Sequence, residues 1–332
     1  MNAISVIIPV YNVENYILDC LKSITKQSLQ QLEIIIVDDC GEDNSMNIVY
    51  DFVKNYHGEM KFKILHQKQN LGLSAARNLG IKASTSPWIY FIDSDDQIDK
   101  TCLETLYQYA TEEKEMIQAN FSLIVNGKES DTISFSYETQ LELDIEEYIQ
   151  LYKNRAIQWA AWNRLLKREW ICQHELYFEN GLYCEDVLWS FRLLGYLNHI
   201  TLLSNRTYYY IHNPKSIMGR VETEETISIH NKKAMKVYLD QVLITDIMLS
   251  YIKTDTHYQK ESIITFYNKI RYHFLFDKIR SLKIQKVTKY KMLCQLVKTV
   301  FGFNYNRLPL QDHLTFIIRY IYMKLYIILK SL

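Results

Sequence analysis

Residues 32–39 read LEIIIVDD, an almost continuous apolar run that ends in two aspartates. Such β-branched runs are typical of strands that are buried on both faces of a parallel sheet. Comparable runs predict three further strands, at residues 4–10, 61–66 and 88–92. Amphipathic spacing predicts helices in the intervening segments, at residues 13–27, 42–56 and 74–83. The alternation predicts an α/β fold with a mostly parallel sheet and helices on both faces.

Polar residues follow four of these predicted strands at the points where the strands end. They are Tyr11 and Asn12, Asp38 and Asp39, Asn70, and residues 93–96 (DSDD). Pro9 suggests that the ladder of the first strand stops near this point. In open parallel sheets, ligands bind beyond the carboxyl ends of the strands. We therefore expect the site at this edge.

The chemistry of this edge excludes the common nucleotide motifs. The first glycine of the chain is Gly41, so the first strand–helix turn has neither a G-x-G-x-x-G motif nor a P-loop. The edge is instead acidic, because Asp93, Asp95 and Asp96 lie within four residues. Carboxylate oxygens suit Mg²⁺ or Mn²⁺, which bind one or two carboxylates together with substrate phosphates. The alternative is an acidic cap of a helix predicted at 101–114.

Composition sets broad limits on the protein class. The chain has 332 residues, of which 48% are hydrophobic and 23% charged, and its 38 basic residues balance 38 acidic ones. These values exclude a disordered chain and a bulk nucleic-acid binder. The six cysteines form no C-x-x-C pair and are expected to be reduced thiols. We expect neither a signal peptide nor a membrane-spanning helix.

The C-terminal segment is strongly basic. Residues 278–330 contain eleven Lys or Arg and one acidic residue, Asp312, and residues 314–332 are rich in Ile, Leu, Phe and Tyr. A basic helix with an apolar face can bind an anionic membrane surface. An ordinary helical domain with a solvated basic face and a module that binds a protein partner are the open alternatives.

Four segments carry a family resemblance: residues 4–12 (ISVIIPVYN), 34–39 (IIIVDD), 70–80 (NLGLSAARNLG) and 90–96 (YFIDSDD). In order and spacing they resemble the family 2 glycosyltransferases of the GT-A fold, which make bacterial surface polysaccharides. The resemblance covers about residues 1–220. It implies a GT-A domain with a nucleotide-binding half (1–100) and an acceptor half (101–220). A mainly helical, basic region at 221–332 is expected to follow.

The resemblance also implies a nucleotide site. Pro9, Tyr11 and Glu14 would border the nucleobase and the ribose. Asp39, with Asp38 beside it, would accept a hydrogen bond from uracil, so that no buried donor is left unpaired. From the residues alone, a position capping the sheet stays open for Tyr11.

The diphosphate and metal site is implied in the same way. Arg77 and Asn78 would face the nucleotide and the diphosphate, Asp93 the ribose or the metal, and Asp95 would be the main ligand of Mn²⁺ or Mg²⁺. The remaining predicted donor-site residues are Asn70, Ser94 and Asp96. An arginine fork suits phosphate, but a structural ion pair of Arg77 with the acidic loops stays open.

The acceptor half contains the predicted base. Residues 179–194 (ENGLYCEDVLWSFRLL) resemble the family's acidic segment, which makes Asp186 the candidate general base, with Glu185 beside it. A sugar hydroxyl must lose its proton as it attacks. Without the resemblance, both acids would be read as favourable charges in the first turn of a helix.

Two further segments resemble acceptor and loop regions of the family. Trp162 and Asn163 would line the acceptor or sugar pocket, although a core position for Trp162 stays open. His212, Ser216 and Arg220 would lie in a loop that reaches the phosphates. Residues 208–210 are predicted to form a strand in the core.

These features predict an inverting, metal-dependent glycosyltransferase that uses a nucleotide sugar, and the resemblance favours a UDP-linked one. Its acceptor would be a hydroxyl of a lipid-linked or growing surface glycan, at the inner, cytoplasmic face of the membrane. The alternative is a non-catalytic nucleotide-sugar-binding or regulatory partner of a polysaccharide-assembly complex. A homodimer stays open, and no nucleic-acid partner is expected.

Overall fold

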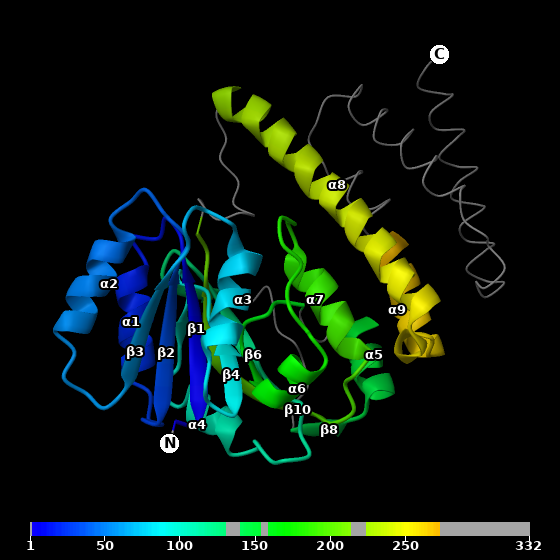
Figure 1. Cartoon of the computed structure of the whole chain (residues 1–332), viewed down its shortest axis with the longest axis horizontal. Coiled ribbons are helices and arrows are strands. Elements are labelled where there is room, and N and C mark those ends of the chain that lie inside the picture. The colour runs from blue at the N-terminus through cyan, green and yellow to red at the C-terminus, as the bar shows by residue number, and fades with distance from the viewer. Residues whose placement is uncertain (1, 131–139, 154–158, 214–223, 273–332) are drawn as a thin grey trace. The chain divides into compact units, whose positions relative to one another are not determined.

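The computed structural model describes residues 2–130, 140–153, 159–213 and 224–272 (Figure 1). Four parallel strands, in the order β3-β2-β1-β4, form the N-terminal half of its sheet. They are β1 (Ile4–Val10), β2 (Leu32–Asp38), β3 (Lys61–His66) and β4 (Trp88–Phe91). All residues of β1 and β4 are buried, as their apolar runs predict. The four strands predicted from the sequence are therefore confirmed.

The sheet continues past β4 with mixed directions. The strand β9 (Arg164–Lys167) runs antiparallel between β4 and β6 (Met116–Val125), and β10 (Ile200–Ile211) lies parallel to β6. The short strands β5 (Gln97–Ile98) and β8 (Leu141–Leu143) pair with β10, and β7 (Lys128–Ser130) pairs with β6. This architecture confirms the predicted α/β class and includes the predicted strand at 208–210.

Helices cover both faces of the sheet. Alternate side chains of a strand point to opposite faces, so the residues of β1 divide between two cores. Val6 and Ile8 pack into the core that contains α1 (Ile17–Thr25), α2 (Ser45–Lys54) and α4 (Cys102–Tyr107). Ile7 packs into the other core with α3 (Leu73–Ala83), α6 (Arg168–Gln173) and α7 (Glu185–Leu194). Gly80 lets α3 approach β1, because a Cβ there would lie 2.4 Å from the Ile7 side chain.

Two predicted helices begin later than the sequence suggests. The helix expected at 13–27 begins at Ile17, and before it the backbone N–H groups of Val13 and Glu14 donate to Ser45 Oγ and Asp43 Oδ2, both at 2.8 Å. The helix expected at 42–56 begins at Ser45. The helix expected at 101–114 is much shorter and ends at Tyr107.

Pro9 ends only one of the two ladders of β1. The pairing of β1 with β4 stops at Ile7, whereas its pairing with β2 continues through Pro9 to Val10. The missing N–H of Pro9 therefore costs no ladder hydrogen bond.

A compact unit spans Met1–Lys278, so it includes the last described helices. These are α5 (Ile145–Lys153), the long helix α8 (Glu224–Thr254), a 3₁₀ turn (Thr256–Tyr258) and α9 (Glu261–Tyr272). Ile244 and Met248 of α8 share a core with α7. The domain boundary expected at 220 stays a prediction, and the basic segment 278–330 lies outside the described residues. Among the described helices, none has the length and apolar character needed to cross a bilayer.

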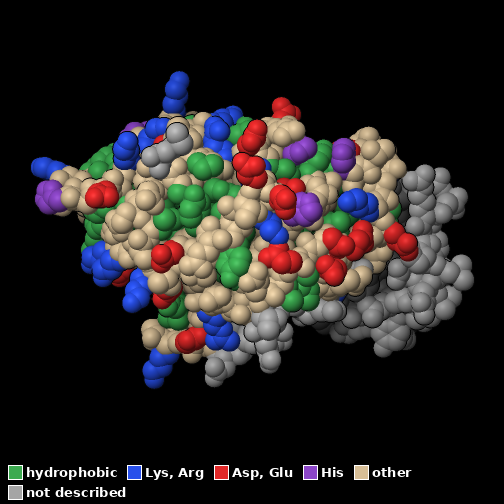
Figure 2. Space-filling model, turned by 90° about the horizontal axis from the view of Figure 1, so that it is seen from below, with side chains coloured by type: hydrophobic (Ala, Val, Ile, Leu, Met, Phe, Trp, Pro, Cys, Tyr) green, Lys and Arg blue, Asp and Glu red, His purple; other side chains and the backbone are tan. Residues whose placement is uncertain are grey.

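Acidic side chains gather at the end of the sheet that lies opposite the carboxyl ends of β1, β2 and β4 (Figure 2). Figure 2 shows this face, and its acidic side chains lie mostly to the right, where β8 and α5 lie in Figure 1. Asp144 and Glu147 cap α5 reciprocally: Asp144 Oδ1 accepts from the Glu147 N–H at 2.9 Å, and Glu147 Oε2 from the Asp144 N–H at 3.1 Å. Glu142 pairs with Lys114. These acids therefore have structural roles.

Candidate functional site

The carboxyl ends of β1, β2 and β4 meet at one edge of the sheet, the upper edge in Figure 1. Asp38 ends β2 and residues 93–96 follow β4. The first turn of α7 contains Glu185 and Asp186. Arg77 links Glu185 to Asp93 at this edge. We call Asp93, Asp95, Asp96, Glu185 and Asp186 the acidic cluster.

Arg77 of α3 joins the two parts of the acidic cluster. Its Nη1 donates to Glu185 Oε1 at 2.8 Å and its Nη2 to Asp93 Oδ1 at 2.7 Å. The guanidinium is buried and lies over the Phe178 ring. Burial lowers the pKa of Arg77, but the charges of Asp93 and Glu185 outweigh it and raise the pKa above its ordinary value. In the structure, Arg77 therefore forms the structural ion pair with the acidic residues that the sequence left open.

Asp186 lies beside this network. Its Oδ1 accepts a hydrogen bond from the Val187 N–H at 2.9 Å. Burial and the charge of Glu185 raise the pKa of Asp186 to about 7, against the opposing effect of Arg77. A carboxyl group that titrates near neutral pH is matched to general-base catalysis.

Asp95 and Asp96 both bind the end of β10, but in different ways. Asp96 is fully buried and accepts hydrogen bonds from the Tyr208 hydroxyl at 2.6 Å and the Ile211 N–H at 2.7 Å. Asp95 is partly exposed, and its Oδ2 accepts from Asn213 Nδ2 at 3.0 Å. Asp96 thus holds β10 in place from a buried position, whereas Asp95 is exposed enough to reach a ligand.

The acidic cluster carries negative charge that a divalent cation could offset, but it is not a complete metal site by itself. Among the described residues it forms ion pairs with Arg77 alone. Burial and the charge of Asp93 raise the pKa of Asp95, so the ionised form of its side chain is destabilised in this position. No group of three or more His, Cys, Asp or Glu in the described residues could hold a metal. A cation at Asp95 and Asp93 would therefore need water and phosphate oxygens as its other ligands.

Asp39 organises the loop before α3. The side chain is buried, and its Oδ1 accepts from Gln67 Nε2 at 2.6 Å and the Leu71 N–H at 2.8 Å. Oδ2 accepts from the Gly72 N–H at 3.0 Å, and Gly72 has the left-handed φ of 87° that this turn requires. Burial raises the pKa of Asp39, although these backbone bonds oppose it. Within the described residues, Oδ2 accepts no other hydrogen bond, so it keeps one lone pair.

The other predicted nucleobase residues differ in exposure. Tyr11 is 45% exposed, and Glu14 and Asn70 are also exposed, whereas Pro9 is buried within β1. Glu14 accepts from the Asn44 N–H at 3.0 Å, next to the start of α2. Tyr11 therefore presents an exposed aromatic ring at this edge.

Asn78 uses its amide group within the protein, and Ser94 is buried. Asn78 Nδ2 donates to the Phe178 carbonyl and its Oδ1 accepts from the Phe178 N–H, both at 2.8 Å. Ser94 is 6% exposed. Asn78 thus fastens the segment before α7 to α3.

Trp162 and Asn163 are buried in the structure. The Trp162 ring stacks on Tyr208, with ring centroids 4.2 Å apart, and the residue is 7% exposed. Asn163 is fully buried, and its Nδ2 donates to the carbonyls of Ala119 and Asn120. The core alternative for Trp162 is thus the one that the structure has. The amide of Asn163 ties the residue before β9 to β6, and its pocket-lining role stays a prediction.

The predicted phosphate loop is described only in part. His212 is exposed, and its backbone N–H donates to the Ile124 carbonyl at 2.8 Å. Ser216 and Arg220 lie outside the described residues.

Sequence reasoning missed three residues at this edge: Phe178, Tyr210 and Asn213. Phe178 lies under Arg77, Asn213 binds Asp95, and Tyr210 is partly exposed near the acidic cluster. A two-residue period along residues 208–210 could have placed Tyr210 on the same face as Tyr208. No sequence signal identifies the other two.

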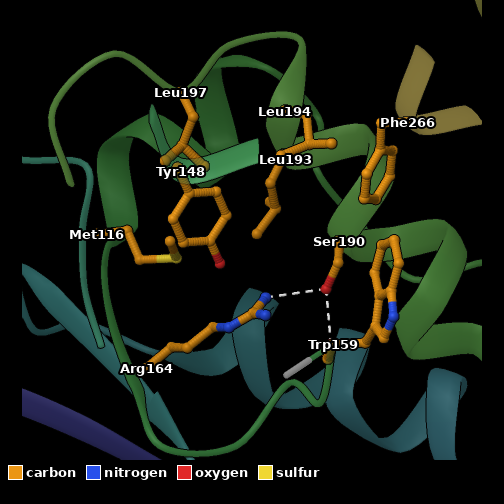
Figure 3. Close-up of a pocket in the computed structure, with 9 residues that line it drawn as sticks. All are labelled: Met116, Tyr148, Trp159, Arg164, Ser190, Leu193, Leu194, Leu197 and Phe266. Carbon is orange, nitrogen blue, oxygen red and sulfur yellow. Dashed lines mark hydrogen bonds between the residues drawn. The ribbon is translucent and has the colours of Figure 1, made fainter. Parts of the chain in front are cut away.

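A separate pocket lies between α7, α9 and β9, lined mainly by apolar side chains (Figure 3). Arg164 donates to Ser190 Oγ at 2.9 Å, and Ser190 donates to the Trp159 carbonyl at 2.7 Å. The pocket has room for about one water molecule. It is far too small for a nucleotide sugar.

Comparison with known proteins supports the sequence resemblance. Residues 5–167 match the model of glycosyl transferase family 2. The chain is 33% identical to the putative glycosyltransferase EpsH of Bacillus subtilis over 226 residues, which are 66% of this chain and 64% of EpsH. It is 28% identical to the glycosyltransferase GlyG of Streptococcus pneumoniae over 90% of this chain and 96% of GlyG.

A solved structure with a similar fold is that of Staphylococcus aureus TarS in complex with UDP-GlcNAc. The TM-score is 0.58 at 19% sequence identity, covering 92% of this chain and 94% of that structure. TarS is named a poly(ribitol-phosphate) β-N-acetylglucosaminyltransferase. The similarity confirms the expected fold.

Proposed function

This chain belongs to glycosyl transferase family 2 through residues 5–167, and we propose that it transfers a sugar from a UDP-sugar to a hydroxyl group of a glycan. The observation that supports this proposal is the network around Arg77, which links Asp93, a proposed metal ligand, to Glu185, the neighbour of the proposed base Asp186. Asp93 and Glu185, 92 positions apart in the chain, bind the same guanidinium. The binding of UDP-GlcNAc by TarS, which has a similar fold, supports a UDP-linked donor.

The donor would lie across the carboxyl edge of the sheet. Asp39 would accept a hydrogen bond from the uracil, Tyr11 would stack beside the uracil ring, and Asp95 and Asp93 would hold Mn²⁺ or Mg²⁺. When bound, the cation would stabilise the negative charge that develops on the departing diphosphate. Arg77 keeps Asp93 and Glu185 in place by its two hydrogen bonds.

Asp186 would act as the general base. As the acceptor oxygen bonds to the anomeric carbon, the bond from that carbon to UDP breaks, and the acceptor proton moves to Asp186. Attack from the face opposite the diphosphate inverts the anomeric configuration in one displacement. We further propose a lipid-linked or growing surface glycan as the acceptor, and an anionic membrane as the partner of the basic segment 278–330.

The proposal predicts a pH dependence with a definite sign. Asp186 accepts a proton only when it is ionised, and its pKa is raised to about 7. We therefore expect kcat/KM to rise about tenfold per pH unit below pH 7 and to level off above it. The measurement is UDP release at saturating Mn²⁺ between pH 5.5 and 9. A rate that is constant from pH 5.5 to 8 would contradict this role.

A further inference from the structure

The structure has three consecutive tyrosines at the end of β10, and they differ in how their hydroxyl groups are used. Tyr208 donates to Asp96 Oδ2 at 2.6 Å, and Tyr209 donates to Asp99 Oδ2 at 3.4 Å. Within the described part of the chain, no hydrogen bond of the Tyr210 hydroxyl is found. Tyr210 is also only partly buried, whereas Tyr208 is fully buried.

The ring of Tyr210 is held in a fixed orientation. It is stacked on Trp162, with ring centroids 5.7 Å apart and planes 17° apart, and it meets Phe121 edge-on at 6.5 Å. Trp162 is in turn stacked on Tyr208. Tyr210 is thus the outer member of a rigid aromatic cluster, which fixes its hydroxyl at little entropic cost.

Tyr210 lies on the same face of β10 as Tyr208, whose hydroxyl donates to Asp96 Oδ2 at 2.6 Å and accepts from the Asp93 N–H at 3.3 Å. Burial and the charges of Asp96, Asp95, Asp93 and Asp186 raise the pKa of Tyr210 to about 12. Ile211, the next residue, also donates its N–H to Asp96 at 2.7 Å, so the phenol of Tyr210 lies close to the acids that follow β4, and it remains a hydrogen-bond donor at neutral pH. In the proposed reaction, the transferred sugar occupies the space between the diphosphate and the attacking hydroxyl.

We propose that Tyr210 binds the transferred sugar of the donor, with its hydroxyl donating a hydrogen bond to a sugar oxygen. This inference rests on the proposed function. It replaces Trp162, which is buried, as the aromatic residue that contacts the sugar.

The test compares Tyr210→Phe with Tyr209→Phe, the same chemical change one residue away on the other face of β10. Calorimetry with Mn²⁺ measures the affinities for UDP and for UDP-GlcNAc, UDP-glucose and UDP-galactose. We expect Tyr210→Phe to lower the ratio of UDP-sugar to UDP affinity about 5-fold for the sugar that wild type binds tightest. UDP affinity should stay within about twofold. Tyr209→Phe should change neither quantity.

Two other results would overturn the proposal. An unchanged ratio in Tyr210→Phe, or an equal loss of UDP and UDP-sugar affinity, overturns the sugar contact while leaving the proposed function intact. Failure of wild type to bind UDP or any UDP-sugar overturns the proposed function and this inference together.

Discussion

Asp186→Asn should lower the rate of sugar transfer by about 10³-fold while leaving UDP affinity within about threefold of wild type. Asparagine keeps the shape of the side chain, but its amide cannot take a proton from the acceptor hydroxyl. Because Asp186 lies in the first turn of α7 and is not a predicted metal ligand, donor binding should survive. Steady-state UDP release and calorimetry with UDP measure the two quantities.

Glu179→Gln is the matched control, because Glu179 is exposed in the segment just before α7. It should transfer sugar at the wild-type rate. Transfer by Asp186→Asn at the wild-type rate would contradict the assignment of the base. A wild-type protein that binds UDP-sugars but transfers none to any glycan acceptor would favour the non-catalytic binding partner.

The N-terminal half of the fold could be predicted from the sequence because three of its four strands, β1, β2 and β4, are buried on both faces. Apolar runs such as residues 4–10 have few other structures open to them. The topology then brings their polar ends together, so the site edge follows from the strand order. The strand β9 could not be predicted, since RLLK is too short to show a period and its pairing with β4 is a long-range choice.

The roles of individual site residues were harder to predict, because they depend on contacts between distant segments. Arg77 and Glu185 are 108 positions apart, and nothing in either local sequence identifies the pair. Asp95 and Asp96 are neighbours of the same type, yet one is partly exposed and the other fully buried. Trp162 and Tyr210 belong to one aromatic cluster, and only the fold shows which of them reaches the surface.

Arg77→Met should lower the free energy of unfolding by about 3–5 kcal/mol, because it leaves the carboxylates of Asp93 and Glu185 without their charged partner. The pair with Glu185 is buried, with side-chain exposures of 3% for Arg77 and 9% for Glu185. Methionine fills much of the space of the arginine stem, so the loss is mainly electrostatic. Urea unfolding followed by circular dichroism measures it.

Arg206→Met is the control for this prediction. Arg206 pairs with Glu129 at 2.8 Å, but both side chains are nearly half exposed, at 45% and 48%. Exposed ion pairs contribute about 0–1 kcal/mol, so this variant should be nearly as stable as wild type. Equal losses in the two variants would show that the Arg77 network does not hold the site together.

The central claim is that the carboxyl edge of the sheet binds a UDP-sugar through a metal ion at Asp95. Thermal unfolding of wild type and Asp95→Asn with UDP, in Mn²⁺ or in EDTA, tests it most directly. UDP at 100 times its dissociation constant should stabilise wild type in Mn²⁺ by about 2.7 kcal/mol. Most of this gain should vanish in EDTA and in Asp95→Asn. No stabilisation of wild type by UDP, or equal stabilisation under all these conditions, would contradict the account.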